Sequence, residues 1–196
     1  EPEATPEGRE AALRLLARLG DTALAEAMAD TVPAGALESV HLARVQHPAI
    51  EAAFQRLLEQ ATAAQDPERE AEALEALAIL RGCPEALAGF LGPPTRDDDD
   101  PGRWQWEEAR ALVLAGDPVG AVLARTRAGT DVGGASIEGV VGLGRTKDAR
   151  VTQRLQAWRD APGSGLLWPA TAALALQGDA SARGLGALPA LGAHLR

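Results

Sequence analysis

Hydrophobic residues recur along this chain at the spacing of an α-helix. Ile50, Phe54, Leu57 and Leu58 stand one, three or four positions apart, which places them on one face of a helix. Thr5, followed by Pro and Glu, is a typical helix start. The pattern predicts helices over 6–19, 24–32, 36–45, 49–64, 71–80 and 85–91.

A short turn sequence returns at a fixed interval in the second half of the chain. Leu-Ala-Gly-Asp ends at Asp117, Gly-Arg-Thr-Lys-Asp at Asp148, and Leu-Gln-Gly-Asp at Asp179, so successive aspartates lie 31 residues apart. Such a period is typical of stacked helical pairs. In the first half of the chain the expected helix-to-helix turns, at Asp21, His47 and Cys83, are less evenly spaced.

The sequence therefore predicts an all-α fold, specifically a right-handed α-solenoid of about five to six helical hairpins. Residues 1–91 are expected to form acidic hairpins, and 103–196 the regular repeats of the same continuous solenoid. Between them, 92–102 holds prolines and four consecutive aspartates and cannot continue a helix. Aromatic residues make up only 3% of the chain, which favours closely packed helices over a sheet covered by large side chains.

Three glycines interrupt the helix expected before Asp148. Gly139, Gly142 and Gly144 each cost about 1 kcal/mol relative to Ala inside a helix. We expect the helix to tolerate them where a neighbouring helix packs closely.

The repeated unit resembles a HEAT repeat, and more narrowly the short bacterial HEAT-like repeats of phycobilin lyases. The segment 111–119, Ala-Leu-Val-Leu-Ala-Gly-Asp-Pro-Val, carries the resemblance best, and 172–179 carries it next. Tetratricopeptide repeats are the nearest alternative, but they usually carry Tyr and Phe at set positions, and this chain has no Tyr and two Phe. The resemblance implies an architecture and no particular chemistry.

Charge is unevenly distributed in this chain of net charge −9. Residues 1–100 hold 20 acidic and 8 basic residues, net −12, whereas 101–196 hold 8 and 11, net +3. The acidic half disfavours contact with nucleic acid or an anionic membrane. No apolar run is long enough to span a bilayer, so we expect no membrane insertion and a cytoplasmic location. The acidic start without Met suggests processing or a longer parent protein.

The acidic loop before residue 103 is a weak calcium candidate. Asp97, Asp99 and Glu108 occupy positions 1, 3 and 12 of a calcium loop, with Gly102 at position 6. Pro101 stands where an oxygen ligand is needed, so a solvated acidic loop is favoured. No metal or cofactor is expected.

Tryptophan and arginine are the candidate partner-binding residues. Trp104 and Trp106 point in different directions on a helix, so at least one is expected at the surface, where tryptophan often anchors interfaces; the alternative is that one fills the gap left by the interrupted repeat. Arg127, Arg154 and Arg159 lie on the second helices of two successive repeats, together with Arg125 and Arg150. They would form a ladder facing an acidic partner or a phosphate backbone or, alternatively, an ordinary solvated face.

Catalysis finds little support in the sequence. The three histidines are isolated, the glycines at 139–144 lack a dinucleotide-loop spacing, and Cys83 has no nearby His. The function expected is a non-enzymatic adaptor that binds a protein on its inter-repeat surface through Trp104, Trp106, Arg127, Arg154 and Arg159. Two alternatives stay open: a nucleic-acid binder resembling HEAT-like DNA-repair glycosylases, and a HEAT-like lyase subunit.

Overall fold

A computed structural model of the chain describes residues 5–19, 36–93, 101–126, 137–161 and 165–179. These residues form helices and turns, with no β-strand among them, so the predicted all-α class is confirmed. The chain divides into two compact units, Glu1–Arg125 and Thr126–Arg196. The N-terminal unit therefore extends past the Pro/Asp-rich stretch 92–102. The expected helix 24–32 lies outside the described residues.

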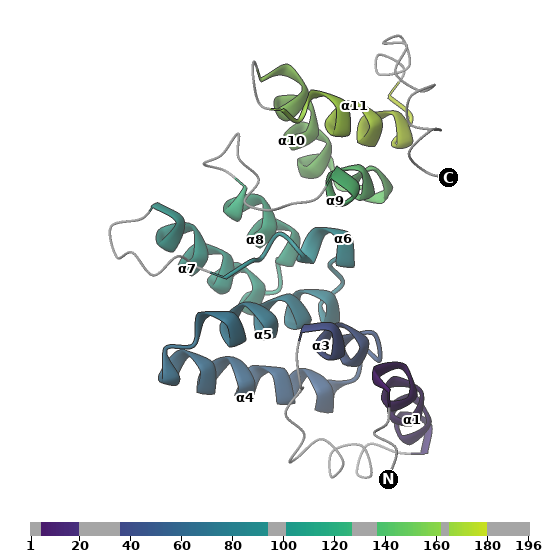
Figure 1. The fold of residues 1–196 in the computed structure, drawn as a ribbon, viewed down its shortest axis with the longest axis vertical. Coiled ribbons are helices and arrows are strands. Elements are labelled where there is room, and N and C mark those ends of the chain that lie inside the picture. The colour runs from purple at the N-terminus through teal and green to yellow at the C-terminus, as the bar shows by residue number, and fades with distance from the viewer. Residues whose placement is uncertain (1–4, 20–35, 94–100, 127–136, 162–164, 180–196) are drawn as a thin grey trace. The chain divides into compact units, whose positions relative to one another are not determined.

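The N-terminal unit is a layered set of helices (Figure 1). In chain order they are α1 (Pro6–Leu19), α3 (Ala36–Ala43), α4 (Pro48–Ala64), α5 (Pro67–Leu80), α6 (Glu85–Ala88), α7 (Pro101–Leu114) and α8 (Pro118–Arg125). Figure 1 shows α5 between α3 and α4 on one side and α7 and α8 on the other, and α5 contacts all four. Its Leu74 and Leu77 are fully buried, as is Phe54 of α4.

Successive helices are joined by turns that close one helix and open the next. Gly116 has φ +87°, a conformation available to glycine at little cost, and the Asp117 amide donates to the Leu112 carbonyl at 2.8 Å. The Asp117 carboxylate then accepts from the Gly120 amide at 3.0 Å. The same arrangement joins α4 to α5: the Asp66 amide donates to the Ala61 carbonyl at the end of α4, and the Asp66 carboxylate accepts from the Arg69 amide at the start of α5. These are Schellman ends followed by N-caps; the left-handed position is Gly116 in the first turn and Gln65 in the second.

The C-terminal unit contains α9 (Ile137–Gly142), the 3₁₀ helix η1 (Leu143–Arg145), α10 (Ala149–Asp160) and α11 (Leu167–Leu176). The helix expected over the three glycines is thus an α-helix that tightens into a 3₁₀ turn. The 10-residue α11 packs against α9, η1 and α10. It has no charged residue, and its residues from Pro169 to Leu174 are buried, as expected for a helix without a polar face.

At Gly144 the backbone of η1 comes very close to α11. A Cβ atom built there would lie 2.5 Å from the Ala173 carbonyl oxygen and 2.8 Å from the Ala173 Cα and the Leu176 Cβ. The predicted close packing beside these glycines is confirmed at Gly144.

Gly144→Ala is expected to destabilise the C-terminal unit by about 1–3 kcal/mol, the usual cost of overpacking. The added methyl meets backbone atoms of α11, which cannot move aside as a flexible side chain can. Denaturant unfolding monitored by tryptophan fluorescence measures the loss. Gly89→Ala is the matched control, because its Cβ would meet the nearest atom, the Glu85 carbonyl oxygen, at an ordinary 3.8 Å. Equal stability of the two variants would contradict the tight contact.

No described helix combines the length and the apolar character needed to cross a membrane.

Candidate partner-binding surface

One face of α7 packs against the N-terminal unit and the opposite face is open to solvent. Ala109 and Val113 are completely buried on the inner side. On the outer side the exposed positions recur every three or four residues: Trp104, Glu107, Glu108, Ala111 and Leu114. We call these five residues the outer face of α7. Their spacing spans an arc of about 120° at the period of an α-helix.

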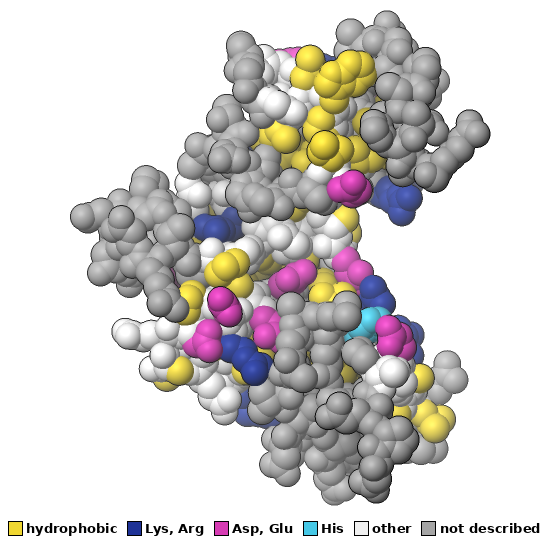
Figure 2. Space-filling model, in the orientation of Figure 1, with side chains coloured by type: hydrophobic (Ala, Val, Ile, Leu, Met, Phe, Trp, Pro, Cys, Tyr) yellow, Lys and Arg dark blue, Asp and Glu magenta, His cyan; other side chains and the backbone are white. Residues whose placement is uncertain are grey.

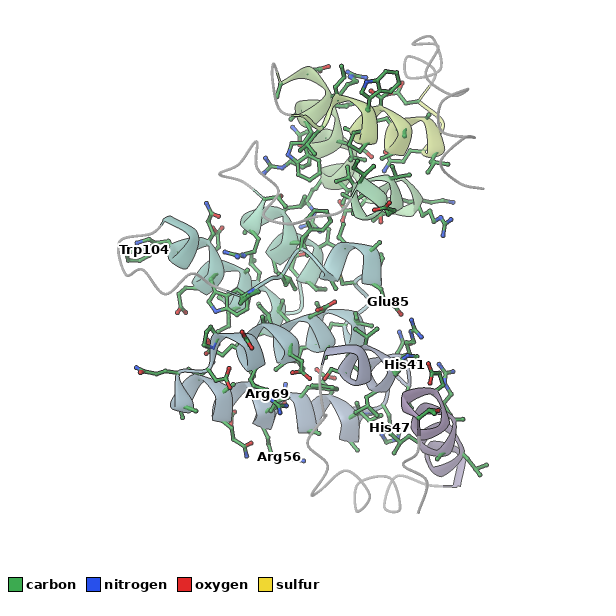
Figure 3. All side chains as sticks on the ribbon, in the orientation of Figure 1. His41, His47, Arg56, Arg69, Glu85 and Trp104 are labelled. Carbon is green, nitrogen blue, oxygen red and sulfur yellow. The ribbon has the colours of Figure 1, made fainter. Side chains whose placement is uncertain are left out.

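Trp104 and Trp106 have opposite environments. The Trp104 side chain is 79% exposed, and it projects from the first turn of α7 away from the other helices of the unit (Figure 3). Trp106 is only 2% exposed. The Arg125 guanidinium lies 5.5 Å from the centre of its ring, a cation–π distance. The expectation that Trp106 contacts a partner is therefore wrong, because the ring belongs to the core.

The inner side of α7 is also held by arginines from other helices. Arg81, just after α5, contacts the Glu51 carboxylate of α4 at 2.6 and 2.8 Å. The same guanidinium donates to the Val113 carbonyl of α7. Arg125 of α8 donates to the Gly92 carbonyl at 3.3 Å. The bond from Arg81 to Val113 and the packing of Arg125 over Trp106 hold the inner side of α7 against the unit.

Two of the arginines predicted to form a basic ladder, Arg150 and Arg159, pair with nearby carboxylates. In the C-terminal unit Arg150 pairs with Asp148 at 2.9 Å, and this hydrogen bond lowers the pKa of the Asp148 carboxyl. Arg159 pairs with Asp160 at 2.7 Å and lies 3.8 Å from Asp179. Arg154 is half-buried on α10.

Arg125 belongs to the N-terminal unit and covers Trp106. Arg127 lies outside the described residues. Of the predicted contact residues, Trp104 and Trp106 belong to the N-terminal unit, and Arg154 and Arg159 belong to the C-terminal unit. Among those that the structure describes, Trp104 has the most exposed side chain, whereas Trp106 is buried and Arg154 and Arg159 are half-buried.

Exposed apolar side chains of the C-terminal unit were missed at the sequence level. Figure 2 shows hydrophobic side chains on the part built from α9 to α11, where the large exposed ones are Ile137, Leu167, Trp168 and Leu176. A signal was present, because α11 has no charged residue to mark a solvent face. Periodicity alone does not show which apolar residues of α11 lie at the two ends of the helix, where they are exposed.

An open hollow of about 430 Å³ lies where α1, α3 and the α5–α6 turn meet. Arg44 spans it and pairs with the Glu85 carboxylate at 2.6 and 2.9 Å, while its other nitrogen lies 3.3 Å from His41 Nδ1. Figure 3 shows His41 and Glu85 along this edge of the unit. Arg14 donates to the Arg44 carbonyl at 3.3 Å. The charged groups of the hollow are thus engaged with one another.

Cys83, which lines the same hollow, is a buried thiol. Burial, followed by the nearby Glu75 carboxylate, raises its pKa to about 12. The thiol is therefore protonated at neutral pH and is a poor nucleophile. The Glu75 pKa is itself raised by burial and then by the charges of Glu72 and Glu85.

The weak calcium candidate has one residue in the described part of the chain. Glu108 is exposed on α7, whereas Asp97 and Asp99 lie outside the described residues. Within the described ranges, no group of three or more His, Cys, Asp or Glu side chains is arranged to hold a metal ion.

Comparison with protein-family models, curated proteins and solved structures found no match to this chain.

Proposed function

We propose that this protein is a non-enzymatic helical-repeat scaffold, a HEAT-like right-handed solenoid, which binds a protein partner on the outer face of α7. The solenoid arrangement and the partner are both parts of this proposal. Each has its own support in the structure.

Several polar contacts at separations of 31 to 33 residues support the repeat arrangement. In the N-terminal unit, hydrogen bonds join Ser39 to Glu72, Arg81 to Val113, and Arg125 to Gly92, at separations of 33, 32 and 33 residues. In the C-terminal unit the Gln177 amide donates to the Thr146 carbonyl, 31 residues away. Stacked repeats place equivalent positions side by side, so contacts at one repeat length are what a solenoid requires. Within the units, α3 packs on α5, α6 on α8, and α9 on α11.

The exposure of Trp104 carries the proposal of partner binding. A tryptophan that leaves 79% of its side chain in water gains nothing from the core of its own unit. Tryptophan is enriched among residues that dominate interface energies, and exposed apolar patches mark interaction surfaces. Leu114, 42% exposed on the same helix, extends the apolar surface.

Capture from lysate tests the proposal. The tagged protein is expected to retain one protein at near-stoichiometric yield from nuclease-treated lysate of its source organism, and Trp104→Ala is expected to abolish retention, because an interface anchor is removed. Quantitative mass spectrometry of the retained material measures both. The matched control is Trp168→Ala, which removes the same side chain from the C-terminal unit. If the partner is lost with Trp168→Ala but is still retained by Trp104→Ala, the outer face of α7 is excluded as the binding site. Retention of nucleic acid alone, in lysate without nuclease, would contradict the scaffold function.

A further inference from the structure

We propose that the partner docks on the outer face of α7 as a basic amphipathic α-helix. This inference rests on the proposed function and names the class of its partner. It follows from the order of apolar and acidic side chains on this face.

The apolar positions suit an antiparallel or parallel helix laid along α7. Trp104 and Leu114 are ten residues apart, which is about 15 Å along a helix. Between them stands Ala111, also exposed, whose small side chain permits close approach of a second helix. An amphipathic helix presents its own apolar residues every three or four positions and recognises such a surface through them.

The charge of the face selects a basic partner. Glu107 and Glu108 are exposed between the two apolar anchors. Residues 1–125 carry 23 acidic and 11 basic residues, net −12. The Arg110 side chain of α7 is half-buried. Lys or Arg residues flanking the apolar stripe of the incoming helix complement this potential, whereas acidic residues or a phosphate backbone are repelled.

Binding of two synthetic helical peptides to the full chain tests the inference. One peptide has Leu at helical spacing and Lys elsewhere, and the other has Glu in place of every Lys. Fluorescence anisotropy of the labelled peptides measures Kd. The Lys peptide is expected to bind, with a Kd that rises with added salt because exposed charges are screened, and the Glu peptide is expected not to bind.

Two surface variants locate the binding. Trp104→Ala is expected to raise the Kd of the Lys peptide by about tenfold, because it removes an interface anchor. Glu107→Lys is expected to raise it by about as much, because it sets a like charge against the lysines of the peptide. Glu59→Lys is the matched control, since Glu59 is an exposed glutamate of α4 in the same unit. Glu59→Lys makes the same charge change away from α7 and is expected to change Kd much less than Glu107→Lys does. The comparison distinguishes binding at α7 from general attraction of the peptide to an acidic protein.

Three results would overturn the inference: no binding of the Lys peptide, equal binding of the Glu peptide, or equal effects of Glu107→Lys and Glu59→Lys. The proposed function fails in a different way. If a cellular partner is captured and is lost with Trp104→Ala, but the Lys peptide does not respond to the α7 variants, the scaffold function stands and the basic helix is rejected.

Discussion

Trp106→Ala is expected to lower the free energy of unfolding of the N-terminal unit by about 3–5 kcal/mol, the usual cost of truncating a buried aromatic residue to Ala. The Trp106 side chain is 2% exposed and has the Arg125 guanidinium over its ring. The substitution therefore opens a cavity under α8 and removes a cation–π contact. Urea unfolding followed by circular dichroism at 222 nm measures the change in midpoint.

Trp104→Ala is the control for this prediction, because it removes the same side chain two positions earlier. Its side chain is 79% exposed, and surface substitutions usually change stability by less than about 0.5 kcal/mol. The two variants are thus expected to have opposite effects. Trp106→Ala lowers stability and leaves the partner-binding anchor in place. Trp104→Ala leaves stability unchanged and removes the anchor. Similar stabilities for the two would show that Trp106 does not belong to the core.

The contrast between these tryptophans shows where sequence analysis stops. Their spacing on a helix predicts that they point in different directions, and the structure agrees. The helical period of α7 places Trp106 in line with Ala109 and Val113, and Trp104 in line with Glu107 and Glu108, so it favours Trp106 as the buried one. The sequence does not show that Arg125 reaches across from α8 to cover the Trp106 ring. A long-range contact of this kind leaves no periodic signal along the chain.

Local structure was more predictable than the candidate site. Thr5 caps the first helix through a hydrogen bond to the Gly8 amide, and the Gly-Asp turn at Asp117 has the geometry that its residues favour. These features depend on neighbours in sequence. The pairing of Arg159 with Asp160 is also local, but periodicity does not distinguish a paired arginine from one that faces a partner. The expected basic ladder was inferred from position alone, and for this reason it overlooked the nearby carboxylates.

Arg81→Ala is expected to lower the free energy of unfolding of the N-terminal unit by about 2–4 kcal/mol, because it disrupts a partly buried charge network. The Arg81 side chain is 16% exposed, and it joins three helices through Glu51 of α4 and the Val113 carbonyl of α7. Its loss leaves the Glu51 carboxylate, 34% exposed, without this cation. It also removes a side-chain hydrogen bond to the α7 backbone. Denaturant unfolding of the full chain gives the magnitude.

The position of Arg81 makes this variant a test of how the helices of the N-terminal unit are held together. Its two contacts reach 30 residues back and 32 residues forward along the chain, so one guanidinium connects α5 to the helices on both of its sides. Arg56→Ala is the matched control, since Arg56 is exposed on α4 and its loss is expected to cost less than about 0.5 kcal/mol. In Glu51→Ala the Val113 contact remains, so a smaller loss than in Arg81→Ala is expected. If Glu51→Ala cost as much as Arg81→Ala, the ion pair alone would account for the effect, and the bond to α7 would contribute nothing to the packing of α5 against α7.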